Sequence, residues 1–341
     1  MRVLFIGGTG TISTSISRQL LEQGCELYLL NRGNRNGEFS GRAHEIRGDI
    51  NDETDIAKKI GDKQFDVVAD FIAFNTQALE RDYRLFKGKT KQFIFISSAS
   101  AYQKPLGDYR ITEGTPLANP YWEYSRNKIA CEEYLMSLYR KETFPITIVR
   151  PSHTYNEYGA PLGVHGNKGS WQVLKRMIDG KPVIIHGDGT SLWTMTHASD
   201  FAKAFIGLLG NIHAIGETVQ ITSDETLTWN QIHEAIAAAL NVELNAVHIS
   251  SEFLALCEKY DYTGALIGDK AHSVVFDNTK LKHLVPGFTA TKRFDEGIRE
   301  TVNYLLSHKE FQVEDIEFDQ WCDKIIEVRK KALQEIKRNN Y

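Results

Sequence analysis

The sequence predicts an α/β protein built on a doubly wound parallel sheet, with a smaller α/β lobe toward the C-terminus. Short apolar runs rich in β-branched residues recur through the first 150 residues, and longer amphipathic segments separate them. This regular alternation ends near Arg150. Nearly continuous apolar runs indicate strands covered on both faces, and right-handed crossovers through the intervening helices make such strands parallel.

Five strands are expected in this first part of the chain. They lie at residues 3–6, 26–30, 66–71, 93–96 and 146–149. Segment 11–23 has the helical period, because Ile12, Ile16 and Leu20 are four residues apart. We therefore place one domain at residues 1–155.

The pattern after this domain is less regular and predicts a lobe at residues 156–310, with some segments returning to the first sheet. Within it we expect a helix at 170–179, a strand at 182–185 and a second helix that begins with a capping box at 228–231. Residues 311–341 form a C-terminal helical extension. This extension carries an apolar stripe at Trp321, Ile325, Val328, Ala332 and Ile336. Packing on its own domain is the expected use, and an interaction helix is the alternative.

Composition excludes several classes of protein. The 341 residues carry a net charge of −4, which gives no general attraction to nucleic acid or to anionic membranes. The four cysteines are scattered without a C-x-x-C pair, which argues against zinc and disulfide frameworks. No apolar run approaches the roughly 18–20 residues that span a bilayer, and no signal peptide is recognisable. We expect a cytoplasmic protein.

A glycine-rich turn lies at residues 7–13, directly between the first strand and the first helix. A side chain there would hold the backbone away from a pyrophosphate, whereas the helix N-terminus offers free N–H groups and partial positive charge. The spacing predicts a Rossmann dinucleotide site. Its expected contacts are Gly7, Thr9, Gly10, Thr11 and Ile12. The third small position is Ser13 rather than glycine.

In such sites the residue at the end of the second strand binds the adenosine ribose. An acid there binds the 2′-hydroxyl of NAD, and an arginine favours the 2′-phosphate of NADP. This chain has Asn31 and Arg32 at that point, with Arg35 close behind, so NADP is slightly favoured and NAD remains open. Asp49 and Ile50, after a further short strand, are expected at the adenine ring.

Tyr124 and Lys128 are four residues apart and so share one face of a helix. The lysine charge lowers the pKa of the phenol, which can then exchange a proton with a carbinol or carbonyl oxygen while hydride moves at the nicotinamide. Tyr83 and Lys87 have the same spacing. The first pair is preferred because it follows a strand that ends in serines, where a doubly wound sheet binds its ligands.

With these motifs the chain resembles an extended, partly atypical short-chain dehydrogenase/reductase of the NAD-dependent epimerase/dehydratase family. The resemblance covers most of the chain. It is carried by the glycine turn, residues 97–102, residues 113–116, the Tyr-x-x-x-Lys pair, residues 150–155, and a late segment from 187 to 202.

The resemblance implies roles for individual residues. Ser98 would hydrogen-bond the reacting oxygen, Tyr124 would be the acid/base and Lys128 would tune it. Pro151 and Ser152 would line the nicotinamide pocket. A homodimer through the Tyr-Lys helix is also implied.

Three positions depart from the family pattern. Ala99 and Ser100 stand where 4,6-dehydratases carry an Asp-Glu pair, which disfavours that chemistry. Trp193 replaces the arginine that clamps a substrate diphosphate, and could instead stack on a sugar or base. His153 lies in the pocket-lining segment as a substrate contact or a structural residue.

We expect no metal site, because His165, His186 and His197 lack ligand spacing with acids or cysteines. The expected function is an NAD(P)-dependent oxidoreductase or epimerase that acts on a secondary hydroxyl or ketone of a sugar-like substrate. The alternative is a non-catalytic Rossmann-fold protein with an RNA-binding or regulatory role.

Overall fold

The computed structural model describes residues 1–33 and 37–338, and the chain divides into two compact units. Unit 1 is assembled from three stretches of chain, Met1–Thr154, Thr194–Asp224 and Val275–Lys292. Unit 2 contains Tyr155–Trp193, Glu225–Val274 and the described residues from Arg293 on. The chain therefore leaves unit 1 and returns to it twice.

The core of unit 1 is a seven-stranded sheet in the order β12-β7-β5-β4-β1-β2-β3. Every neighbouring pair is parallel. Its strands are β1 (Arg2–Ile6), β2 (Glu26–Asn31), β3 (His44–Arg47), β4 (Val67–Asp70), β5 (Phe93–Ile96), β7 (Ile146–Pro151) and β12 (Thr218–Ile221). The predicted doubly wound parallel sheet is confirmed, and β12 is a returning segment that forms one edge.

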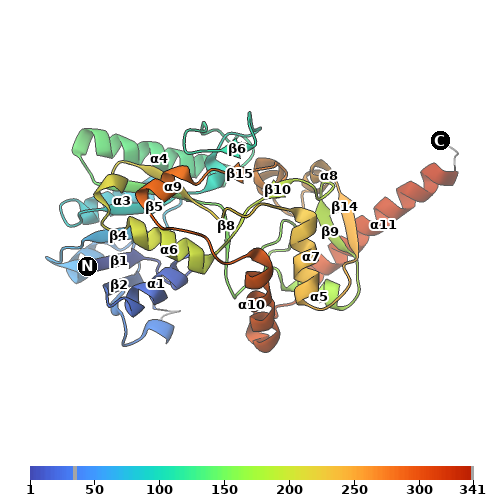
Figure 1. Ribbon diagram of the computed structural model, residues 1–341, viewed down its shortest axis with the longest axis horizontal. Helices are drawn as coiled ribbons and strands as arrows, with labels where there is room; N and C mark the ends of the chain where they lie inside the picture. Colours follow the sequence, from blue (N-terminus) through green and yellow to red (C-terminus); the bar gives the residue numbers. More distant parts are fainter. Residues whose placement is uncertain (34–36, 339–341) are drawn as a thin grey trace. The chain divides into compact units, whose positions relative to one another are not determined.

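Helices cover both faces of this sheet because alternate strand residues point to opposite sides. Val3 and Phe5 belong to the apolar cluster that contains residues of α1 and α6, whereas Leu4 and Ile6 belong to the cluster on the face of α2, α3 and α4 (Figure 1). The helices are α1 (Ser13–Glu22), α2 (Glu53–Ile60), α3 (Thr76–Phe86), α4 (Glu123–Glu142), α6 (Ala198–Leu208) and α9 (Thr279–Leu284).

Short elements complete unit 1. Strand β15 pairs in parallel with β6, and β11 pairs with β8, whose last residue belongs to unit 2. Their bounds are η1 (Gly37–Phe39), η2 (Ala99–Ala101), β6 (Arg110–Ile111), β8 (His153–Tyr155), β11 (Met195–His197), η3 (Ile212–Ala214) and β15 (Val275–Phe276).

Unit 2 has two short strand pairs among helices, β9 with β14 in parallel and β10 with β13 antiparallel. The strands are β9 (Val183–His186), β10 (Leu192–Trp193), β13 (Leu227–Thr228) and β14 (Ala246–Ile249). The helices are α5 (Trp171–Ile178), α7 (Trp229–Ala239), α8 (Ser251–Leu256), the π-helical η4 (Thr263–Lys270), α10 (Phe294–Ser307), η5 (Lys309–Phe311) and α11 (Ile316–Arg338). The predicted capping box at Thr228 and Gln231 is confirmed by both of its hydrogen bonds.

The buried residues of the long C-terminal helix α11 lie in its first half. Phe318, Cys322 and Ile325 are buried, whereas Val328 and Ile336 are 47% and 53% exposed. The first half is anchored by Arg176 of α5, whose guanidinium binds Asp319 and Asp323 at 2.7 Å and the carbonyl oxygen of Pro182. Figure 1 shows the second half extending past β14.

No helix in the described part of the chain is both long enough and apolar enough to cross a membrane.

Because Arg176 is only 1% exposed and joins α5 to α11, its loss should weaken unit 2. We expect Arg176→Met to lower the free energy of unfolding by about 2 kcal/mol, the usual effect of losing hydrogen bonds to a charged group. Lys175→Met is the matched control, because Lys175 makes only a surface pair with Asp179. Urea unfolding measures both, and equal effects of the two substitutions would contradict the anchoring role.

Candidate active site

The glycine turn after β1 admits only glycine at its first position. Gly7 has a φ of +82°, and a Cβ placed on it would lie 2.4 Å from Cγ2 of Ile72. Ser13, the departure from glycine, closes the turn: its hydroxyl donates to the Gly7 carbonyl and accepts from the Gly10 amide, both at 2.9 Å. The serine at the third position therefore stabilises the turn.

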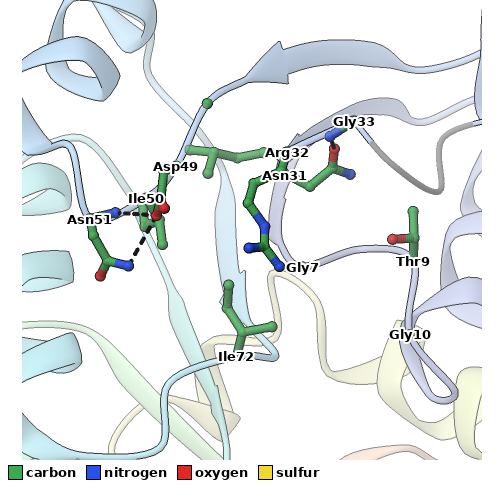
Figure 2. A pocket seen from close by; sticks show the side chains of 12 residues that line it. Gly7, Thr9, Gly10, Asn31, Arg32, Gly33, Asp49, Ile50, Asn51 and Ile72 are labelled. Atoms are coloured by element: carbon green, nitrogen blue, oxygen red, sulfur yellow. Dashed lines mark hydrogen bonds between the residues drawn. The ribbon is translucent and has the colours of Figure 1, made fainter.

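This turn forms one wall of a cavity of about 540 Å³ in unit 1 (Figure 2). The cavity is lined by Gly7, Thr9, Gly10, Leu30, Asn31, Arg32, Gly33, Gly48, Asp49, Ile50, Asn51 and Ile72. The partly polar lining and the glycine wall fit a dinucleotide. Seven of the eleven residues expected to contact the cofactor are in this lining. Thr11 and Ile12, where α1 begins, and Pro151 and Ser152, at the end of β7, are not.

Arg32 extends across the cavity from the end of β2, between the Asp49 side and the Gly7 side (Figure 2). Asn31 shapes the turn beneath it by accepting a hydrogen bond from the Gly33 amide at 2.9 Å. Arg35, expected to assist Arg32, lies outside the described residues. A ligand group bound in the cavity beside the end of β2 would therefore face the Arg32 guanidinium.

Sequence patterns did not indicate Asn51 or Ile72 as cavity residues. Asn51 donates its side-chain amide and its backbone amide to Oδ1 of Asp49, both at 3.0 Å. Ile72 comes two residues after β4. The sequence could have indicated Ile72 only through its position just after a buried strand, because ligands bind at the carboxyl ends of the strands in parallel sheets.

Lys128 of α4 reaches the carboxyl end of the sheet. Its ammonium donates to the carbonyl oxygens of Ala73 and Ile96, each at 2.7 Å. It also lies 5.8 Å from the ring centroid of Tyr124, on the same helix face. The structure thus brings Lys128, Tyr124 and the end of β5 together, and Ser98 follows that strand end by two residues.

Burial lowers the pKa of Lys128 to about 8, although the negative charge of Asp70 acts in the opposite direction. The side chain is 2% exposed. A lysine ammonium in this place is therefore kept partly desolvated, so its field at the Tyr124 ring is weakly screened.

A chain of three hydroxyl groups joins Ser98 to α4. Ser125 donates to Oγ of Ser100 at 2.8 Å, and Ser100 and Ser98 share a hydrogen bond of 2.9 Å. The Ser100 amide also donates to Oγ of Ser98. Because Ser98 accepts from the Ser100 amide and can accept from its hydroxyl, the Ser98 proton can be directed to a ligand oxygen.

The rest of the α4 face is fixed by a buried ion pair. Arg150 at the end of β7 donates to both carboxylate oxygens of Glu132, which also accepts from Ser97. Pro151 is buried in the same strand, and Ser152 follows it with its hydroxyl 3.4 Å from the Thr194 carbonyl oxygen. The helix that carries Tyr124 is thus tied to both β5 and β7.

The remaining candidate residues lie in varied surroundings. His153 is half-buried in β8. Trp193 is 3% exposed and packs on Trp229 at 5.6 Å between ring centroids, which makes it part of the core of unit 2. Tyr83, on α3, packs its ring against Phe144, the second residue before β7.

The histidines expected to be structural have backbone or hydroxyl partners. His186 lies 3.1 Å from the Lys270 carbonyl oxygen, and burial lowers its pKa to about 3. His165 and His197 contact the Gly166 carbonyl and the Ser199 hydroxyl. Within residues 1–33 and 37–338 no cluster of acidic, cysteine and histidine side chains is placed to hold a metal.

Comparison with known proteins identifies the family of the chain. The model of the NAD dependent epimerase/dehydratase family matches residues 3–222. The chain belongs to this family. The matched stretch contains the glycine turn, Ser98, and the Tyr124–Lys128 pair.

Two known proteins are similar over most of the chain. The 2′-dehydrokanamycin reductase of Streptomyces kanamyceticus is 26% identical over 84% of this chain and 80% of the reductase. The chloroplast stem-loop binding protein of 41 kDa b from Arabidopsis thaliana is also 26% identical, over 70% of this chain and 63% of that protein.

Solved structures share the fold. An epimerase from Methanothermobacter thermautotrophicus superposes with a TM-score of 0.75 at 16% identity, covering 91% of this chain and 93% of that one. The UDP-glucuronic acid 4-epimerase of Bacillus cereus, in complex with UDP-glucuronic acid and NAD, gives 0.72 at 19% identity, covering 90% and 99%.

The lowered pKa of Lys128 has a measurable effect on stability. Its pKa is 10.5 ordinarily and about 8 in the folded chain, so between these values the unfolded chain binds more protons. The wild type should therefore gain stability relative to Lys128→Met as pH rises from 8 toward 10.5, by roughly 3 kcal/mol in total.

Below pH 8 the difference in unfolding free energy between the two proteins should be constant. Urea unfolding at a series of pH values measures it. Lys91→Met, at an exposed lysine of the same unit, controls for the loss of a lysine in general. A Lys128→Met difference that does not change between pH 7 and pH 10 would show that the side chain is not buried as described.

Proposed function

We propose that this chain is an NAD(P)-dependent oxidoreductase or epimerase that acts on a secondary hydroxyl or ketone of a sugar-like substrate. The observation that carries the proposal is the meeting of Lys128, Tyr124 and the Ser98 turn at the carboxyl end of the sheet that holds the dinucleotide cavity. Family membership supports the reaction class, and the reductase and epimerase relatives support a sugar-like substrate.

The residues of the chain divide the work at the reacting oxygen. The bound nicotinamide would supply or accept a hydride. Tyr124 gives or takes the proton, and the Lys128 ammonium stabilises its phenolate form. Ser98 donates a hydrogen bond to the same oxygen, because the Ser100–Ser125 chain occupies its acceptor side. Donation by Ser98 favours the polarised carbonyl, which both reduction and epimerisation pass through.

Dehydratase chemistry is less well supported. Ala99 is buried and Ser100 is engaged with Ser98 and Ser125, so neither supplies the acid and base that water elimination needs. Trp193, in the core of unit 2, has no charge with which to bind a substrate diphosphate. Sugars that carry no nucleotide are therefore also candidate substrates.

RNA binding is the second candidate, and one relative is a stem-loop binding protein. The chain is just as similar, at 26% identity, to a reductase, and over a longer part of its length. The similarity to the stem-loop binding protein therefore does not favour RNA binding over catalysis. The net charge of −4 also argues against binding to a phosphate backbone.

The catalytic assignment predicts the effect of Tyr124→Phe. Loss of the phenolic proton should reduce turnover by about 10²–10⁴-fold, the usual contribution of general acid–base catalysis, while cofactor affinity stays within about twofold. Turnover is measured with NADH and NADPH on a keto-aminoglycoside, and with NAD⁺ on UDP-glucose, UDP-glucuronic acid and dTDP-glucose.

The chain offers its own control for this experiment. Tyr83→Phe removes the same oxygen from the other Tyr-x-x-x-Lys pair and should keep full turnover, since the contacts of Tyr83 with Phe144, Lys87 and Glu142 involve no residue of the cavity lining. Full activity of Tyr124→Phe would refute the acid/base role.

The position of Arg32 predicts the cofactor preference. If its guanidinium binds the 2′-phosphate, Arg32→Ala should weaken NADP⁺ by about tenfold or more and change NAD⁺ affinity by less than about twofold. Calorimetric titration with each cofactor measures this. Arg42→Ala, at an exposed arginine outside the cavity lining, is the matched control. An equal loss for both cofactors would contradict a preference set by Arg32.

A further inference from the structure

Arg81 is a buried cation that the proposed reaction does not use. It lies on α3, is 7% exposed, and holds Oδ1 of Asp82 with Nε and Nη2 at 2.9 and 2.8 Å. Burial of a guanidinium is costly unless its donors are engaged. Its remaining donor, Nη1, reaches out of the core to the dinucleotide cavity and binds Oδ1 of Asn51 at 2.8 Å.

The contact with Arg81 fixes the orientation of the Asn51 amide. Because the amide oxygen accepts from Arg81, the amide nitrogen faces Asp49 and donates to its Oδ1 at 3.0 Å. The Asn51 backbone amide donates to the same oxygen. Two donors on Oδ1 fix the rotation of the Asp49 carboxylate, and direct its Oδ2 away from Asn51. Figure 2 shows both hydrogen bonds at the cavity wall.

Arg81 also lies next to Asp70, whose carboxylate binds the backbone of the cavity residue Ile72. Its Nη2 lies 3.8 Å from Oδ2 of Asp70, which is completely buried at the end of β4. The other oxygen of Asp70 accepts from the amides of Ile72 and Ala73 at 2.6 and 2.9 Å. Ile72 lines the cavity, and the Ala73 carbonyl binds Lys128.

The second acid of this cluster supports the charge balance. Burial and the neighbouring Asp70 carboxyl hold the pKa of Asp82 well above its usual range. The Asp70 and Asp82 carboxyl groups both lie against the Arg81 guanidinium, which supplies the positive charge among these buried acids.

We propose that Arg81 is a positioning residue for adenine recognition, which acts through Asn51 to present the Asp49 carboxylate to the exocyclic amino group of the cofactor. This inference rests on the dinucleotide site of the proposed function. It adds that the selectivity for adenine is set from the core of unit 1, by a residue that does not line the cavity.

The same helix provides a matched control. Arg84 is one turn further along α3, is 55% exposed, and pairs with Glu53 of α2. Substitution of Arg84 removes an arginine–carboxylate pair between α3 and α2 without touching Asn51. A general weakening of the α2–α3 region would therefore appear in both variants.

The test compares NAD⁺ with its deamino analogue, in which a carbonyl oxygen replaces the adenine amino group. Dissociation constants are measured by calorimetry for the full-length wild type, Arg81→Met and Arg84→Met. We expect the wild type and Arg84→Met to prefer NAD⁺ by about tenfold, as for a hydrogen bond to a charged group. In Arg81→Met the ratio should fall to about one.

Other results separate the possible failures. A folded Arg81→Met that keeps the wild-type ratio, or that loses affinity equally for both dinucleotides, overturns the inference. If Arg81→Met does not fold, Arg81→Lys, which cannot reach Asp82 and Asn51 together, replaces it with the same expectation. A wild type that binds neither dinucleotide overturns both this inference and the proposed function. Binding with the expected ratios but without turnover overturns only the proposed function.

Discussion

The arrangement of unit 1 depends on one buried ammonium group. Lys128 inserts between the ends of β4 and β5 and is bonded to a carbonyl oxygen at each, so it fixes the loop after β4 as well as the helix that carries it. A charge in that position is unfavourable for folding, because burial opposes ionisation. The surrounding structure compensates with two strong acceptors and with the negative charge of Asp70.

Helix α4 is held by residues at regular intervals along one face. Tyr124, Lys128 and Glu132 are four residues apart, and Glu132 binds Arg150 at the end of β7. Ser125 adds a lateral contact to the Ser98 turn through Ser100. The same helix therefore packs on the sheet and positions the polar groups, which leaves little freedom for Tyr124 to drift from the strand ends.

Local patterns predicted the parts that local physics determines. The glycine turn, the buried strands and the capping box at Thr228 each follow from a short stretch of sequence, and the structure has them where they were expected. The roles of Asn51, Ile72 and Arg81 depend on contacts between segments distant along the chain, so no motif marks them. Trp193 lies in a family motif that suggested a ligand contact, and the structure buries it to 3% exposure against Trp229, a residue 36 positions further along the chain.

The discontinuous make-up of unit 1 has a consequence for synthesis on the ribosome. Residues 1–154 contain six of the seven strands, yet the second neighbour of β7 is β12, which ends at Ile221. Until then β7 is an open edge, and the part of the sheet face later covered by Phe201 and Phe205 of α6 is bare. The nascent chain must protect an apolar sheet that lacks its last strand while roughly another 70 residues emerge, and an open edge with an uncovered apolar face favours aggregation and chaperone capture during that interval.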